Sequence, residues 1–185
     1  MEEYFYKISK NYYKGDVSNK DFHPEAAYQY GATPEFKEKA RSHCEYFSKN
    51  FTKENLPTTE CPPVYDSKWR FFWFIGERDK KSDEGMLMFD NVEPDGFPNW
   101  KDTMNNWGNH MLKGCEVTAE MTALGLGLDK NVFTDRMRYA GHLLAPTGSD
   151  LGKFKAKDIF AGVHYGMLYK ILIKYKRFKF FDYTW

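Results

Sequence analysis

The chain has 185 residues, which is enough for one domain with a substantial buried core and cramped for two. Lys and Arg number 27 against 26 Asp and Glu, and this balance excludes a strong electrostatic attraction to nucleic acid or to an acidic membrane surface. Aromatic residues make up 18% of the chain, which indicates a dense aromatic core, an interface rich in Tyr and Trp, or both.

The N-terminal part predicts two helices. We expect a short helix near the start and then irregular chain up to residue 32, because turn-forming residues follow and no periodicity is clear. Thr33 can cap a helix and Pro34 suits its first position. Apolar residues at helical spacing follow, so the sequence predicts an amphipathic helix over about 34–49.

An aromatic run stands between two predicted loops. Prolines punctuate residues 55–67, which predict a loop. The run WRFFWFI over 69–75 is rich in strand-forming residues and predicts a short buried strand or a packed turn. Residues 76–99 are charged and then broken by Pro and Gly, and they predict a second loop. Residues 1–98 are therefore expected to form an N-terminal region of helix and loops.

A long helix is predicted over about 99–124, because apolar residues there recur every three or four positions. The apolar positions are Trp100, Met104, Trp107, Met111, Cys115, Ala119 and Ala123. Gly125 and Gly127 should end this helix, and Asp129 should cap a short second helix that reaches about Tyr139.

Residues 140–185 predict β-structure. The segment HLLAPTGSDLGKF indicates a strand start, a Pro-Thr-Gly turn and a loop. Two or three strands should follow, because β-branched and aromatic residues alternate there with lysine over 159–165, 168–175 and 178–185. We therefore expect a single α+β domain over 1–185, with helices over 99–139 and strands last.

The three cysteines, Cys44, Cys61 and Cys115, are odd in number and lack paired spacing, so we expect free thiols in a reducing compartment. No apolar run approaches the ~20 residues of a membrane-spanning helix. The start of the chain carries acidic residues and no apolar signal core. These features predict a soluble, intracellular protein, in the cytoplasm or within a large cytoplasmic assembly.

Several segments resemble isopenicillin-N-synthase-like, iron(II)- and 2-oxoglutarate-dependent oxygenases. They are FPNWKDTMNNWGNHMLKGCEVTAEMTALGLGL, VFTDRM, HLLAPTGSDLGKF and IFAGVHY, with YGATPEFKEKARSHCEYF and DSKWRFFWFIGE upstream. The resemblance runs with gaps over about 28–178. It implies a double-stranded β-helix, or jelly roll, with helices packed on one face. In this chain it implies an incomplete jelly-roll sheet over 140–185.

The resemblance also implies a place for iron. The family holds the metal in a two-histidine, one-carboxylate triad, with His-x-Asp on one strand and an Arg-x-Ser pair for the co-substrate downstream. His164 matches the first histidine, but Gly166 stands where the carboxylate belongs, and the second histidine and the Arg-x-Ser pair are not found before Trp185. His164 is thus a residual metal-ligand position that we expect to be unoccupied, and we assign no catalytic and no cofactor-binding residue.

The sequence therefore predicts a non-catalytic structural or interaction subunit, a pseudoenzyme that needs no cofactor. One alternative is a fragment of an active oxygenase whose remaining strands are supplied elsewhere, and only this alternative calls for iron(II) and 2-oxoglutarate. A second alternative is an unrelated binding domain. We expect a protein partner or a second copy to pair with the sheet edge over 164–185, where lysines alternate with apolar residues. No nucleic acid and no membrane span are expected.

Overall fold

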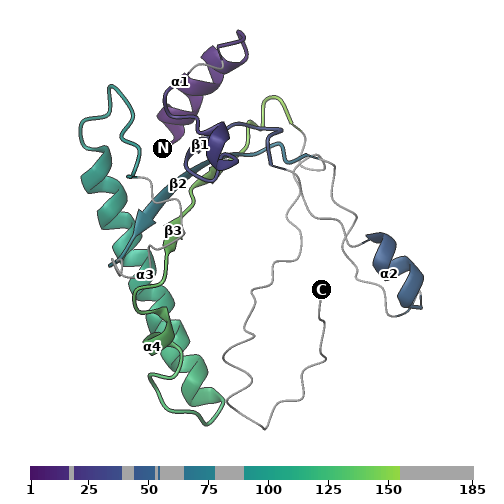
Figure 1. The fold of residues 1–185 in the computed structure, drawn as a ribbon, viewed down its shortest axis with the longest axis vertical. Coiled ribbons are helices and arrows are strands. Elements are labelled where there is room, and N and C mark those ends of the chain that lie inside the picture. Colours follow the sequence, from purple (N-terminus) through teal and green to yellow (C-terminus); the bar gives the residue numbers. More distant parts are fainter. Residues whose placement is uncertain (17–18, 39–43, 53, 55–64, 78–89, 155–185) are drawn as a thin grey trace. The chain divides into compact units, whose positions relative to one another are not determined.

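The computed structural model describes residues 1–16, 19–38, 44–52, 54, 65–77 and 90–154 (Figure 1). The chain divides into two compact units. The first contains Met1–Arg41 and Pro63–Phe160, and the second contains Ser42–Pro62 and Ala161–Trp185. The strands predicted over 159–165, 168–175 and 178–185 lie outside the described residues.

The sheet of the first unit is antiparallel and has β2 (Trp69–Ile75) at its centre. On one side β1 (Gly31–Thr33) pairs with Phe72 to Arg70. On the other side β3 (His142–Leu144) and β4 (Thr147–Gly148) pair with the two ends of β2. This arrangement confirms a mixed α+β fold with an open antiparallel sheet. The strand predicted over 69–75 is confirmed as β2, and it precedes the long helix.

A proline separates the two short strands at one edge of the sheet. The amide of Phe71 donates a hydrogen bond of 3.0 Å to the Pro146 carbonyl, so the ladder with β2 continues through the gap between β3 and β4. Proline lacks an N–H group, and an edge position tolerates this loss. The predicted Pro-Thr-Gly turn is therefore part of an edge strand, with Thr147 paired to Arg70.

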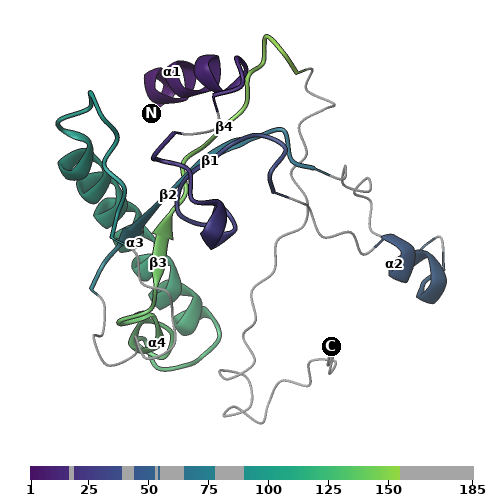
Figure 2. The ribbon, with the colours of Figure 1, turned by 45° about the horizontal axis from the view of Figure 1, so that its top comes forward.

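Two helices pack on one face of the sheet (Figure 1 and Figure 2). Helix α3 (Trp100–Gly125) runs alongside β2 and β3, and α1 (Glu2–Tyr12) lies near β1 and β4. Side chains of β2 alternate between faces, as in any strand, and its odd-numbered aromatic residues meet both helices. The Phe71 ring makes edge contacts with Tyr4 of α1 at 5.3 Å and with Trp100 of α3 at 4.8 Å. The core of this unit is therefore an aromatic layer between β2 and the helices.

The predicted helix over 99–124 is confirmed, and its end follows the expected chemistry. Gly127 has a φ of +68°, a conformation that glycine adopts freely, and the Leu128 amide bonds the Ala123 carbonyl at 2.9 Å. The second helix is shorter than predicted, since α4 covers only Thr134–Met137. It stops because Arg138 adopts a ψ of 129°, which is not helical.

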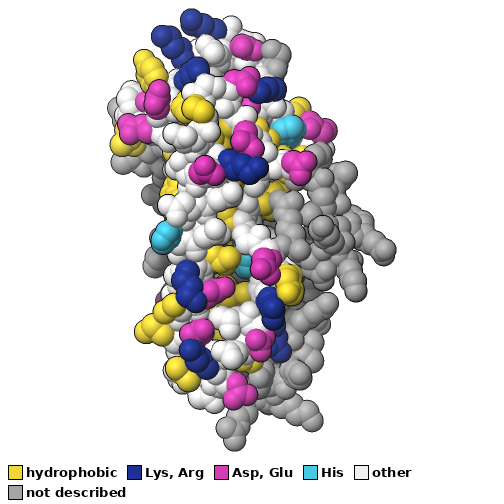
Figure 3. All heavy atoms as spheres, turned by 90° about the vertical axis from the view of Figure 1, so that its left-hand side faces the viewer, with side chains coloured by type: hydrophobic (Ala, Val, Ile, Leu, Met, Phe, Trp, Pro, Cys, Tyr) yellow, Lys and Arg dark blue, Asp and Glu magenta, His cyan; other side chains and the backbone are white. Residues whose placement is uncertain are grey.

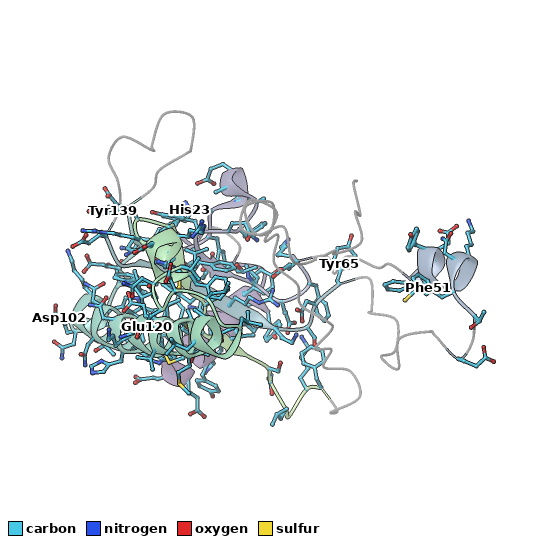
Figure 4. All side chains as sticks on the ribbon, turned by 90° about the horizontal axis from the view of Figure 1, so that it is seen from below. His23, Phe51, Tyr65, Asp102, Glu120 and Tyr139 are labelled. Atoms are coloured by element: carbon cyan, nitrogen blue, oxygen red, sulfur yellow. The ribbon has the colours of Figure 1, made fainter. Side chains whose placement is uncertain are left out.

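Helix α3 is tied to the loop that follows it. Glu120, labelled in Figure 4, forms an ion pair of 3.1 Å with Lys130. The Arg136 side chain donates to the Val132 carbonyl, and Val132 is buried. These contacts hold the segment between α3 and α4 in place, although this segment, which the structure describes in full, contains no helix or strand.

The predicted helix over 34–49 is wrong in its first part. Thr33 ends β1, and its hydroxyl donates to the Tyr28 carbonyl instead of capping a helix. Phe36 has a φ of +61°, and its amide bonds the Asp66 carbonyl at 2.7 Å. Pairing with β2 and with the segment before it therefore overrides the local helical signal.

The helix that forms there is α2 (Cys44–Asn50), which belongs to the second unit. An ion pair with a distance of 2.6 Å joins Lys49 to Glu45, one helical turn earlier. Cys44 is disulfide-bonded, whereas Cys115 on α3 is free and exposed. The prediction of free thiols is therefore wrong for Cys44.

The helix expected near the start is present, but the chain expected to be irregular up to residue 32 also contains a 3-10 turn and the start of a strand. The predicted helix near the start is α1, and it is followed by a 3-10 turn, η1 (Pro24–Ala26), and then by β1. Residues 90–99 contain no helix or strand, in agreement with the loop predicted over 76–99.

Candidate functional site

The predicted metal-ligand position and the predicted binding edge are both in the C-terminal segment. His164, Gly166 and the edge over 164–185 lie outside the described residues. In the part of the chain that the structure describes, no cluster of three His, Cys, Asp or Glu side chains has the arrangement of a metal site. The other candidate sites among the described residues lie in the first unit.

The described histidines do not come together. His23 bonds the Glu25 carboxylate at 2.7 Å, and His110 contacts the Asn106 carbonyl at 2.7 Å on α3. His142, in β3, contacts the Met137 carbonyl at 2.8 Å. Each ring is held by a neighbour within five residues of it. These contacts are typical of structural histidines.

Helix α3 presents large apolar side chains to solvent. The sequence predicts one apolar face, but the helix buries only Trp100, Met104 and Ala123 among its predicted apolar positions and leaves others outside. The exposed apolar residues on this helix are Trp107, Met111, Cys115, Val117, Met121 and Leu124. The exposed fraction of the side chain is 41% for Trp107 and 68% for Met121. The side of the molecule where α3 lies shows hydrophobic side chains among charged ones (Figure 3). We call this set the outer face of α3.

Gly108 is a place where α3 approaches the sheet closely. A Cβ atom on Gly108 would lie 2.2 Å from Cγ2 of Ile75 in β2. With Gly108 turned inward, the adjacent Trp107 is rotated away from the sheet, because neighbours in a helix point about 100° apart. The sequence pattern missed this, since glycine carries no apolar side chain to count.

A pocket with a volume of about 860 Å³ lies between β2 and α3. Its polar groups are largely engaged with one another. The Trp73 indole donates to Asn105 at 2.9 Å, and Asn91 bonds both the amide and the carbonyl of Phe74 at 2.8 and 2.9 Å. Amides and carboxylates line it, without a histidine or cysteine among the described lining residues. This composition is typical of a hydrated structural cleft.

A smaller pocket of about 170 Å³ lies beside α1 and contains a buried carboxyl group. The Tyr4 hydroxyl donates to Oδ2 of Asp21 at 2.8 Å. Burial raises the pKa of Asp21 above its ordinary value, although the Tyr4 hydrogen bond and nearby Lys20 act in the opposite direction. Burial also raises the pKa of Tyr4. The pair fixes α1 to the segment before β1.

A charged cluster joins the segment after β1 to the start of β2. Arg70 pairs with Asp66 at 2.7 Å and also with Glu38, and Lys68 lies 3.3 Å from Asp66. Burial lowers the pKa of Arg70 from its ordinary value. Opposite charges in this cluster compensate one another, as buried charges must. The cluster holds the chain on the C-terminal side of Phe36 in place.

No protein-family model, curated protein or solved structure matches this chain. Among the described residues, no helix combines the length and the apolar character needed to cross a lipid bilayer.

Proposed function

We propose that this protein is a non-catalytic structural or interaction subunit built on an incomplete isopenicillin-N-synthase-like oxygenase fold. Support for the fold comes from the resembling segments together with the arrangement of a 26-residue helix on an antiparallel sheet. An architecture of this general kind is shared by many proteins, so the chemistry of specific residues must carry the functional proposal.

The residue pair His164 and Gly166 carries the non-catalytic part of the proposal. The family needs a carboxylate two residues after its first histidine, and glycine offers no donor atom there. A single imidazole cannot hold iron(II) against water and competing metals. The chain then has no means of activating oxygen at this position.

The outer face of α3 supports the interaction part of the proposal. Trp and Met are enriched in protein interfaces, and Trp107, Met111 and Met121 are 41%, 51% and 68% exposed. The partner is proposed to be a protein or a second copy of the chain, bound through the predicted sheet edge over 164–185.

The experiment is a turnover assay. We expect the purified chain, supplied with iron(II), ascorbate, oxygen and 2-oxoglutarate, to form no succinate above a metal-free control, while an active 2-oxoglutarate oxygenase assayed in parallel does. Succinate formation that disappears in a His164→Ala variant would refute the proposal. That outcome would favour the alternative in which the chain is a working part of an oxygenase.

A further inference from the structure

Lys153 inserts its ammonium group into a cage of aromatic rings that has a buried carboxylate at its base. Its Nζ atom lies 3.9 Å from the ring centre of Tyr13, 5.1 Å from that of Phe154 and 5.5 Å from that of Phe36. The same atom pairs with Oε1 of Glu35. We call these four residues, Tyr13, Glu35, Phe36 and Phe154, the cation cage.

Glu35 is the unusual member of the cage. Its side chain is only 1% exposed, and its second carboxylate oxygen, Oε2, is buried without a hydrogen-bond partner. A buried carboxylate needs a positive partner, and Lys153 is the cation that the described residues give it. The carboxylate therefore marks a place where the fold requires a cation.

The cage is open to solvent on its other side. Tyr13 is 44% exposed and Phe36 is 46% exposed. The Phe36 ring stands edge-on to the Phe154 ring at 5.8 Å. A ligand could therefore reach the base of the cage if Lys153 left it.

A short turn positions Lys153 beside the cage. Oδ1 of Asp150 accepts hydrogen bonds from the amides of Gly152 at 2.9 Å and Lys153 at 3.2 Å, and the Asp150 carbonyl accepts one from Phe154 at 2.8 Å. The five residues 150–154 thus form a compact turn, whereas Glu35 and Phe36 follow β1. The occupant and the base of the cage come from separate segments, 118 residues apart.

We propose that the cation cage is a binding site for an alkylammonium group and that Lys153 occupies it as an internal ligand. Several rings around one cation, with a carboxylate behind it, are the chemistry that recognises lysine side chains and quaternary ammonium groups. An external ligand must displace Lys153. Because Lys153 belongs to the same chain, its effective concentration at the cage is high. This site is independent of the oxygenase-like fold and of the sheet edge over 164–185.

The test compares the wild-type chain with Lys153→Ala, which empties the cage. The probes are tetramethylammonium chloride and N-acetyl-lysine amide, titrated by calorimetry. We expect Lys153→Ala to bind at least one probe about tenfold or more tightly than the wild type, since no internal competitor remains. A preference for the lysine amide indicates a peptide side chain as the natural ligand, and a preference for tetramethylammonium indicates a small quaternary amine.

Two further variants make the test specific. Lys113→Ala, which removes a lysine that is 69% exposed on α3, should bind no better than the wild type. Adding Tyr13→Ala to Lys153→Ala should abolish the gain. Equal binding by Lys153→Ala and wild type, or a gain that survives Tyr13→Ala, would overturn the proposal.

A second readout, the melting temperature, is needed if Lys153→Ala is less stable than the wild type. Such a loss is expected because the variant leaves Glu35 buried without its cation. The probe that binds should then raise the melting temperature of this variant more than an equal concentration of sodium chloride does, because a ligand of the folded state stabilises it. The wild type should show no such difference. A variant that melts identically in both salts would count against the cage.

Discussion

Replacing Phe71 by alanine should lower the free energy of unfolding by about 3–5 kcal/mol, the usual cost of deleting a buried aromatic ring. The Phe71 side chain is fully buried, with 0% exposure, and its ring contacts α1 and α3 at once. Its removal leaves a cavity and also removes a ring contact from both Tyr4 and Trp100 in the aromatic layer. Chemical unfolding followed by circular dichroism measures the loss.

The matched control for this change is Tyr6→Ala. Tyr6 lies on the same helix as Tyr4 but is 71% exposed, so its truncation should alter the free energy of unfolding by no more than about 0.5 kcal/mol. Phe71→Leu should fall between the two. Similar losses for Phe71→Ala and Tyr6→Ala would show that β2 is not the centre of the core.

Alanine substitutions at two glycines of α3 should change stability in opposite directions. Gly108→Ala places a methyl group 2.2 Å from Cγ2 of Ile75, and a β-branched side chain in a strand has little freedom to move away. Overpacking of this kind costs about 1–3 kcal/mol. Replacing glycine by alanine in a helix gains up to about 1 kcal/mol from helix propensity. At so short a distance we expect the overpacking cost to exceed this gain. We expect a lower melting temperature.

Gly114→Ala is the control on the same helix. A Cβ atom on Gly114 would meet nothing within 4 Å, so only the propensity gain of up to about 1 kcal/mol remains. We expect a higher melting temperature for this variant. If both alanines stabilise the protein equally, then α3 does not cross β2 at Gly108 and the outer face of α3 is misplaced.

The sequence predicted the elements whose signals are strong and local. The run over 69–75 is dense in strand-forming aromatic residues, and the helix over 99–124 combines long periodicity with closing glycines, so β2 and α3 appear within a residue or two of the expected bounds. The helix expected over 34–49 failed because Thr33 and Phe36 make backbone bonds to partners outside their own segment. Propensity yields to such tertiary pairing.

The surfaces were harder to predict than the elements. Periodicity shows that α3 has apolar side chains along one broad arc, but only the close approach of Gly108 to Ile75 explains why the adjacent Trp107 lies outside. The cation cage was not predicted. Glu35 lies in the first turn of the helix that the sequence predicts over 34–49, and its partner, Lys153, is 118 residues away. Contacts over that separation leave no periodic signal in a single sequence.

The most direct measurement is the iron content of the purified chain after loading with iron(II) without oxygen and removal of free metal. Because we propose that His164 stands at a ligand position and that Gly166, two residues later, stands where a carboxylate would be needed, we predict an iron content close to that of a His164→Ala variant and far below one iron per chain. One iron per chain that depends on His164 would contradict the account.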